Sequence, residues 1–210
     1  RRTTWTAFWP STTTDSRGEE MRELSLNVLD IAQNSLSAGA SLVEIAVSED
    51  TEKDELVISV RDNGRGMTPE QAARVRDPFY TTRTTRKVGM GVPLFRMAAE
   101  MAGGELTLQS ELGKGTEVTA RFVRSHIDRM PLGDMVGTMT ALIRLNPQVD
   151  FVYRRCFNGR EAVTDTRELR QVLGEVPLDT PEVMEWIDGY LREQEGCVTG
   201  TQPPSDREQA

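Results

Sequence analysis

Hydrophobic and polar positions along this chain follow a helical period first and a strand period afterwards. Residues 24–37 carry one apolar stripe at helical spacing. The stripe consists of Leu24, Val28, Ile31, Ala32 and Ser35. Residues 43–47 and 56–60 then alternate between apolar and polar side chains, which is typical of half-buried strands. The charged segment 49–55 between them predicts a hairpin.

Further elements follow as far as residue 122. Thr68 and Pro69 suit the cap and the first turn of a short helix. Residues 92–101 show a second helical pattern, and two alternating segments flank residues 113–116. The inward side chains of the second pattern are expected to be Leu94, Phe95, Ala98 and Met101. This order of elements predicts an α+β fold, a two-layer α/β sandwich with a mainly antiparallel mixed sheet under helices.

Residues 125–196 predict a small α+β appendage suited to partner contact or dimerisation. Asn158-Gly159 stands between two alternating segments and is a strong signal for a two-residue hairpin turn. Helical patterns cover residues 132–145, 166–173 and 181–194. In the last of these, Trp186, Ile187 and Tyr190 are expected to form the packing stripe.

The two ends of the chain differ from the parts between them. Residues 1–20 are Thr-rich and have no helical or strand period, and residues 197–210 are polar, so we expect disordered tails. Met21 precedes the first periodic segment and suits a natural start. With 37% hydrophobic and 28% charged residues, the remainder can bury a core. We expect one domain at residues 21–124, followed by the appendage.

Charge and cysteine content narrow the class of protein. A net charge of -8 argues against general attraction to nucleic acid or to a membrane surface. The only cysteines, Cys156 and Cys197, are too few for a disulfide framework, which indicates reduced thiols. No apolar run approaches the roughly 20 residues of a membrane helix. These features predict a soluble cytoplasmic protein that binds neither nucleic acid nor membranes.

The polar side of the first helical segment carries two amides and a carboxylate. Asn27, Asp30 and Asn34 are spaced three and four residues apart, so they share one face. A solvated helix face would rather carry Lys and Glu. Oxygen-bearing side chains in one stripe suit a hard cation such as magnesium, which keeps several of its waters.

Glycines and charged residues gather between residues 60 and 94. Asp62 is expected at a strand end, beside Gly64 and Gly66, and a basic segment leads to Gly89-Met90-Gly91 at the start of a helix. Glycine permits close approach of backbone to a ligand, and helix N-termini offer free N–H groups to phosphate. A local excess of positive charge in an otherwise acidic chain would attract a triphosphate. The segment therefore predicts a nucleotide site.

Taken together, these segments resemble the GHKL superfamily of ATP-binding domains, which includes histidine kinases, gyrase, Hsp90 and MutL. The helix with Asn34 resembles the N box, and residues 62–67 resemble the G1 box. Residues 77–83 resemble the F box, and residues 89–91 resemble the G2 box. Residues 113–116 match the segment that usually closes the pocket. The resemblance covers roughly residues 24–122. It implies the Bergerat-type fold of a histidine-kinase-like ATPase domain.

The resemblance also implies ATP and Mg²⁺ as cofactors, with Asn34 as the metal ligand. Asp62 would accept the exocyclic amine of adenine, because a carboxylate offers only acceptors and selects a donor edge. The implied cofactor-binding residues are Asn34, Asp62, Gly64, Gly66, Met67, Phe79, Thr82, Arg83, Arg86, Lys87, Val88, Gly89, Met90, Gly91 and Thr116. Pro93 stands where histidine kinases commonly have a further glycine. Because proline has no N–H and a fixed φ, Pro93 removes one backbone donor and bears on the mobility of the basic segment, which resembles the ATP lid of the family.

Three functions are compatible with the resemblance. The first is a protein kinase acting in trans on a separate regulatory partner, and the second is an ATPase or nucleotide-gated binding switch without kinase activity. The third, a MutL-like repair protein, is disfavoured because residues 77–91 lack a Gly-Phe-Arg-Gly pattern and no large transducer domain follows. The F box favours the kinase. The homodimer is a further possibility.

Two residues bear on the reaction. The sole histidine, His126, follows the domain, and only about twenty residues precede the N-box helix, so we expect a stand-alone module without the phosphoacceptor His hairpin. Asp30 lies one turn before Asn34, where hydroxyl-phosphorylating and ATP-hydrolysing relatives place a glutamate as general base. Asp30 is therefore the candidate catalytic residue. The alternative is a hydrogen-bonding role without proton transfer.

Overall fold

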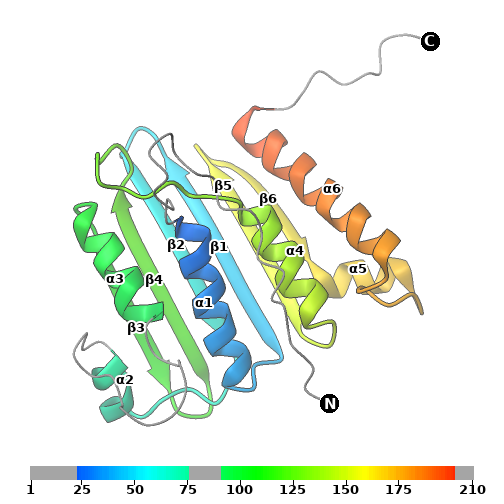
Figure 1. Cartoon of the computed structure of the whole chain (residues 1–210), viewed down its shortest axis with the longest axis horizontal. Coiled ribbons are helices and arrows are strands. Elements are labelled where there is room, and N and C mark those ends of the chain that lie inside the picture. Colours follow the sequence, from blue (N-terminus) through cyan, green and yellow to red (C-terminus); the bar gives the residue numbers. More distant parts are fainter. Residues whose placement is uncertain (1–22, 76–90, 202–210) are drawn as a thin grey trace, which may run out of the picture.

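The structure, a computed structural model, describes residues 23–75 and 91–201. Its strands form one six-stranded sheet in the order β3-β4-β2-β1-β5-β6 (Figure 1). The strands are β1 (Leu42–Asp50), β2 (Glu55–Asp62), β3 (Glu105–Glu111), β4 (Gly115–Val123), β5 (Asp150–Phe157) and β6 (Arg160–Asp165). The helices of the described residues are α1 (Leu24–Ser37), α2 (Pro69–Val75), α3 (Gly91–Met101), α4 (Met135–Leu145), α5 (Thr166–Leu173) and α6 (Pro181–Thr199).

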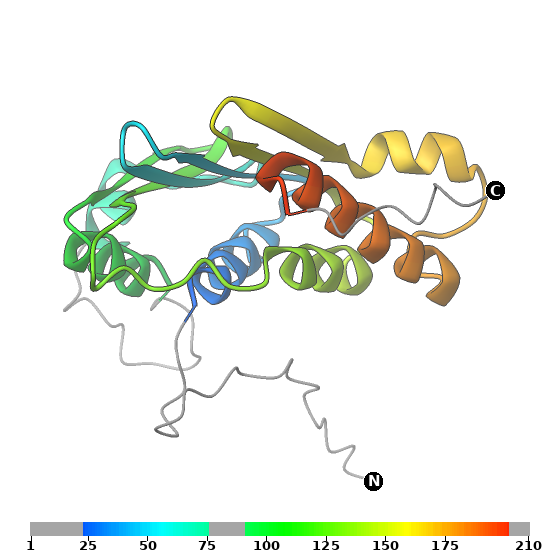
Figure 2. The same cartoon turned by 90° about the horizontal axis from the view of Figure 1, so that it is seen from above.

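Helices α1, α3, α4 and α6 lie on one side of the sheet (Figure 2). The strand residues that alternate toward these helices are buried, as Val43, Ile45 and Val47 of β1 show. Their neighbours on the other face are more exposed. The apolar stripe predicted for α1 is buried in full, from Leu24 to Ser35. The predicted two-layer sandwich is therefore confirmed.

Strand register brings the ends of β2 and β4 together. The β1–β2 and β2–β4 pairs are antiparallel, so Asp62 at the end of β2 lies opposite Thr116 near the start of β4. Strands β3 and β4 are also antiparallel, whereas β1 and β5 are parallel. The sheet is thus mixed and mainly antiparallel, as the sequence predicts. At one end of these strands lie Asp62, Thr116 and the turn between β3 and β4.

The expected appendage continues this same sheet. Asn158 and Gly159 have φ of 49° and 79° and join β5 to β6, which confirms the predicted two-residue turn. Strand β5 pairs with β1 from Leu42↔Asp150 to Glu49↔Phe157. This pairing covers an edge of β1 that would otherwise present unpaired backbone groups. The predicted α+β content is correct, but both parts share one core, and the domain boundary at residue 124 stays a prediction.

Two helix boundaries differ from those predicted. Helix α4 begins at Met135 and not at residue 132, because Gly133 has φ of 79° and the Asp134 carboxylate caps the helix by accepting the Gly137 N–H at 2.8 Å. Helix α6 continues to Thr199, where Gly200 in the left-handed conformation ends it. Residues 197–199 are therefore helical and do not belong to the expected tail.

Two inward side chains were predicted wrongly. Trp186 is 49% exposed and stacks on Tyr190, with ring centroids 5.5 Å apart. Ile187 is buried as predicted, and the buried apolar stripe of α6 consists of Val183, Met184, Ile187, Leu191 and Val198. On α3, Met101 is 57% exposed, since Ala98, Ala99 and Ala102 fill the inward positions at this end. A helical period predicts an apolar face, but the neighbouring elements decide how that face is rotated.

Candidate active site

The carboxylate of Asp62 lies at the centre of the site and is only 8% exposed. Its Oδ1 accepts the backbone N–H of Gly64 at 2.9 Å and that of Thr116 at 3.3 Å. Its Oδ2 accepts the hydroxyl of Ser35 at 2.6 Å. Three donors from α1, the loop after β2 and β4 therefore hold one acidic side chain in place.

The glycines after Asp62 are required by close contacts. A Cβ on Gly64 would lie 3.0 Å from Asp62 Oδ1 and 3.1 Å from the Ala38 carbonyl oxygen. Gly66 has φ of 63°, and a Cβ there would lie 2.0 Å from the Glu111 carbonyl oxygen. The loop is thus pressed between the end of α1 and the β3–β4 turn. Both glycines lie within the predicted site, next to Asp62.

Hydroxyl groups join this loop to β3 and β4. The N–H of Met67 donates to Ser110 Oγ at 2.9 Å, and Ser110 Oγ lies 2.9 Å from Thr116 Oγ1. Ser110 also donates to the Gly115 carbonyl at 3.0 Å. Met67 and Thr116, which were both predicted from the sequence, therefore come together through Ser110.

The polar face of α1 lies against the first residue of α3, and Figure 1 shows the two helices side by side. A Cβ on Gly91 would lie 3.1 Å from Asp30 Cβ and 3.5 Å from Asn34 Nδ2. Asn34 is half-buried, and Asp30 is exposed. The predicted neighbours Asp30, Asn34 and Gly91 are therefore brought together.

The start of α3 has the properties of an anion site. The first N–H groups of a helix lack intrahelical partners, and the helix dipole adds positive potential there. No acidic residue of α3 lies in its first turn. Pro93 is the third residue of the helix and is accommodated, as the sequence predicts, although it removes one of these donors. Gly91 and Val92 remain as backbone donors of this turn, because the N–H of Leu94, the fourth residue, is used within the helix.

Partial burial by neighbouring atoms raises the pKa of the Asp30 carboxyl above its ordinary value of 3.8. Desolvation disfavours the charged form of a carboxyl group, which explains the direction. A carboxyl with a raised pKa is a better proton acceptor when ionised than an ordinary aspartate. Asp30 is thus suited to a proton-transfer role at the mouth of the site.

Several predicted site residues lie outside the described residues. They are Phe79, Thr82, Arg83, Arg86, Lys87, Val88, Gly89 and Met90. For the part of the chain that is described, the structure brings together Asp62, Gly64, Gly66, Met67 and Thr116 on one side, and Asp30, Asn34 and Gly91 on the other. Helix α1 connects the two groups through the adjacent residues Asn34 and Ser35.

The described residues contain no group of three or more His, Cys, Asp or Glu side chains that could hold a metal by themselves. In proteins, magnesium takes one or two protein ligands together with substrate phosphates and water. Asn34 is half-buried with its amide directed at the start of α3. The role of Asn34 as metal ligand stays a prediction, and Asp30 lies one turn earlier on the same helix.

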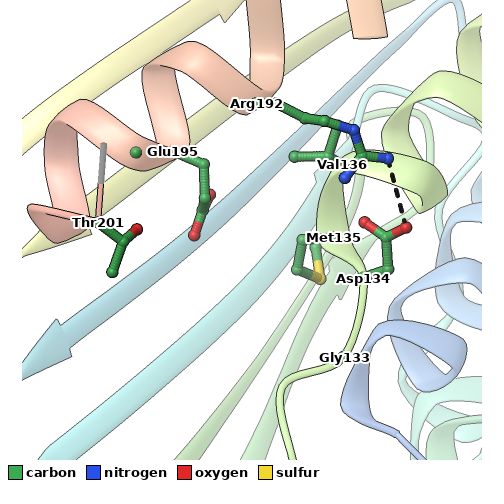
Figure 3. Close-up of a pocket in the computed structure, with 8 residues that line it drawn as sticks. Gly133, Asp134, Met135, Val136, Arg192, Glu195 and Thr201 are labelled. Carbon is green, nitrogen blue, oxygen red and sulfur yellow. Dashed lines mark ion pairs between the residues drawn. The ribbon is translucent and has the colours of Figure 1, made fainter. Parts of the chain in front are cut away.

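A separate pocket of about 270 Å³ lies between the start of α4 and the second half of α6 (Figure 3). Its lining residues are Gly133, Asp134, Met135, Val136, Arg192, Glu195, Gly196 and Thr201. Asp134 and Arg192 face each other across it, 3.7 Å apart. None of the predicted site residues that the structure describes lines this pocket, and Arg192 is already paired with Asp188 at 2.7 Å. We therefore do not assign the site here.

Sequence reasoning missed two residues of the site. Ser35 was placed in the apolar stripe of α1, and Ser110 was not singled out at all. A serine among apolar residues at a fully buried helical position is a signal, because a buried hydroxyl needs a partner. For Ser110 no local signal exists, since its partners Met67 and Thr116 are defined by strand register alone.

Comparison with known proteins places this site in a family. Residues 18–126, more than half of the chain, match the family described as histidine kinase-, DNA gyrase B-, and HSP90-like ATPase. Sensor protein SrrB of Staphylococcus aureus strain NCTC 8325 / PS 47 is 36% identical over 103 residues, which cover 47% of this chain and 17% of SrrB. The SrrB protein of strain N315 matches equally. The chain thus spans less than a fifth of these relatives.

Among solved structures, the N-terminal domain of a DNA repair protein aligns with a TM-score of 0.47 and 16% identity. The alignment covers 67% of this chain and 51% of that one. No helix among the described residues has the length and apolar content needed to cross a membrane. From the family match, and with Asp62, Asn34 and the glycine-bearing loops in the order described, the chain belongs to the histidine kinase-, DNA gyrase B- and HSP90-like ATPase family.

Proposed function

We propose that this chain binds ATP with magnesium and transfers the γ-phosphoryl group to a separate regulatory protein. The observation that carries this proposal is the joint placement of Asp30 and Asn34 against the start of α3. The family match and the similarity to sensor protein SrrB support the use of ATP and favour the kinase branch. In this proposal, adenine lies at Asp62 and the phosphates lie toward Gly91.

Magnesium, held by Asn34, would neutralise phosphate charge as the reaction proceeds. The chain's own residues bind the phosphates and accept the proton. The backbone N–H groups at the start of α3 bind phosphate oxygens, and the partner's nucleophile attacks the γ-phosphorus as ADP leaves. Asp30 takes the proton of a hydroxyl nucleophile. Its raised pKa suits this role.

The position of His126 supports transfer to another molecule. Asp62 and Thr116 meet at one end of β4, and His126 follows Val123 at the other end. Seven residue steps along a strand span about 23 Å. His126 Nδ1 also accepts the Asp128 N–H at 3.2 Å, which orients the ring toward its own turn. Transfer to His126 of the same chain is therefore disfavoured on distance.

The test uses the chain with its co-purified partner and ATP labelled at the γ-phosphate. We expect label on the partner, and we expect Asp30→Asn to slow labelling by about 10²- to 10⁴-fold while ATP binding survives. His126→Ala is the matched control and should label the partner normally. Loss of labelling in His126→Ala with full activity in Asp30→Asn would show self-phosphorylation and overturn the proposal.

A second function, ATP hydrolysis or nucleotide-gated binding, is favoured by one observation. Asp30 is exposed at the site's mouth, so its carboxylate can position a water molecule as readily as a protein hydroxyl. The same experiment separates the two functions, because hydrolysis releases labelled phosphate and leaves both proteins unlabelled. A homodimer is compatible with either function.

A further inference from the structure

The buried hydroxyl of Ser35 contacts the carboxylate that is proposed to meet the base. Ser35 is 3% exposed, and its Oγ lies 2.6 Å from Asp62 Oδ2 and 3.4 Å from the Ile31 carbonyl oxygen. A serine has one proton to donate, and hydroxyl hydrogen bonds are strongest near 2.7 Å. The proton therefore goes to Asp62, 27 residues away in sequence.

This arrangement differs from the usual behaviour of a helical serine. A hydroxyl inside a helix commonly donates to the carbonyl four residues earlier, and that bond would satisfy Ser35 without any partner outside α1. Here the long distance to Ile31 and the short distance to Asp62 favour the tertiary contact. The hydroxyl is thus directed at the site and does not serve its own helix.

The three donors leave part of the acceptor capacity of the Asp62 carboxylate unused by the residues that the structure describes. A carboxylate offers about four lone-pair sites, two on each oxygen. The N–H groups of Gly64 and Thr116 occupy both sites of Oδ1, and Ser35 occupies one site of Oδ2. With respect to the residues that the structure describes, one acceptor site on Oδ2 remains, in a direction fixed by Ser35. That single site suits one donor, such as the exocyclic amine at position 6 of adenine.

We infer that Ser35 is a positioning residue that makes the nucleotide site selective for a 6-aminopurine, an inference that rests on the proposed ATP binding. Among the described residues, Ser35 is the one hydrogen-bond donor to Oδ2. Without it, Oδ1 alone anchors the carboxylate, and the broad terminal torsion of aspartate lets Oδ2 move. The open acceptor site then no longer faces the base.

The same helix carries both halves of nucleotide recognition. Ser35 points inward to Asp62, and the preceding Asn34 directs its amide at Gly91 at the start of α3. Consecutive helical residues point about 100° apart, so one turn of α1 serves two walls of the site. Removal of the Ser35 hydroxyl should therefore affect the base side and leave the phosphate side intact.

The experiment compares two nucleotides on the full chain by titration calorimetry with magnesium present. One is ATP, and the other is purine riboside triphosphate, which has hydrogen at position 6 in place of the amine. The unsubstituted chain should prefer ATP by about ten- to a hundredfold, as expected for one hydrogen bond to a charged group. Ser35→Ala should lose most of that preference through weaker ATP binding, with little change for the second nucleotide.

Two further variants control for folding and size. Ser37→Ala removes an exposed hydroxyl at the end of α1 and should keep the full preference. Ser35→Thr retains the donor and should restore preference, and Ser35→Cys, a weaker donor, should fall between. Equal weakening of both nucleotides in Ser35→Ala, with a lower melting temperature, would indicate a structural role and overturn the inference.

The outcomes also separate this inference from the function on which it rests. If the unsubstituted chain prefers ATP and Ser35→Ala keeps the same preference, the role of Ser35 is wrong while ATP binding stands. If the unsubstituted chain binds neither nucleotide, the proposed function itself fails, and the inference fails with it.

Discussion

At the scale of single residues, the glycines of the site have a structural cause as well as a functional one. Gly115 has φ of 106°, and a Cβ there would lie 1.9 Å from the Asp62 carbonyl oxygen. Gly66 meets the Glu111 carbonyl oxygen in the same way. In both cases a backbone atom fills the space, so the neighbour cannot yield as a flexible side chain would. The loop's shape around Asp62 thus depends on these glycines.

Gly66→Ala should therefore destabilise the chain by about 2 kcal/mol or more, through a positive φ combined with a backbone clash. Gly189→Ala is the matched control: Gly189 is exposed in the middle of α6, with nothing within 4 Å of the added Cβ. It should stabilise by about 0.5 to 1 kcal/mol. Urea denaturation measures both, and equal stability of the two variants would contradict the loop geometry.

Asp30 gives a pH dependence whose sign is fixed by its raised pKa. The folded chain binds this proton more tightly than the unfolded chain, so the stability contribution is fully present below pH 3.8 and is lost as pH rises through the folded pKa. Asp30→Asn should therefore melt higher than the unsubstituted chain at pH 7, and the difference should vanish in acid. Scanning calorimetry of both at several pH values tests this, and a pH-independent difference would contradict the raised pKa of the Asp30 carboxyl.

At the scale of elements, sequence patterns predicted the features that depend only on residues near one another in the chain. The buried stripe and polar face of α1 follow from helical periodicity alone, and both are found as expected. The β5–β6 hairpin follows from Asn158-Gly159, because few other residue pairs adopt positive φ twice in succession. Asp62 was correctly placed at a strand end, facing the helices.

Pairing between distant segments was not predictable in this way. Nothing in the sequence of β1 states that β5, some hundred residues later, will pair with it in parallel. On α6, Ile187 was correctly predicted to face the core, but Trp186 was not, since Met184 reaches the core in its place. The Ser35–Asp62 contact likewise depends on how α1 docks on β2. Register and docking are properties of the assembled sheet.

Helix α6 is tied to the sheet by a buried ion pair. Arg155 of β5 is 3% exposed, and its Nε lies 2.7 Å from Glu195 of α6. It also pairs with Glu49 of β1. Removing Arg155 takes its partner from the half-buried Glu195, whereas Glu49 keeps Arg124 at 3.1 Å. The link therefore joins α6, β5 and β1 in a single unit.

Arg155→Ala should cost about 3 to 5 kcal/mol of stability. The adjacent Arg154 is a matched control on the same strand, because it pairs with Glu161 at an exposed position, 51% and 44% exposed respectively. Arg154→Ala should cost about 1 kcal/mol or less. Chemical denaturation compares them, and a similar cost for both variants would show that burial of Arg155 contributes little.

At the scale of the whole molecule, the ATPase domain and the following residues share one sheet. Strand β5 covers the edge of β1, and Met139, Leu142 and Ile143 of α4 are fully buried in the common core. The family match ends at residue 126, whereas the core does not. The end of the family match at residue 126 is therefore not the end of the hydrophobic core.

Removal of all residues after 124 should abolish cooperative unfolding or lower the melting temperature strongly, because it exposes β1 and the apolar contacts of α4. Thermal unfolding followed by circular dichroism measures the effect. A truncated chain that melts near the full chain would show that residues 21–124 form an independent domain, as the sequence alone had suggested.

In the proposed function Asp62 recognises the nucleotide, and calorimetric titration of magnesium and ATP into Asp62→Asn tests this role. Asp179→Asn, in the exposed connection before α6, is the control. We predict that Asp62→Asn weakens ATP binding by about 1.5 to 3 kcal/mol, roughly ten- to a hundredfold, while Asp179→Asn binds like the unsubstituted chain. Unchanged ATP affinity in a folded Asp62→Asn variant would contradict the assignment of the site.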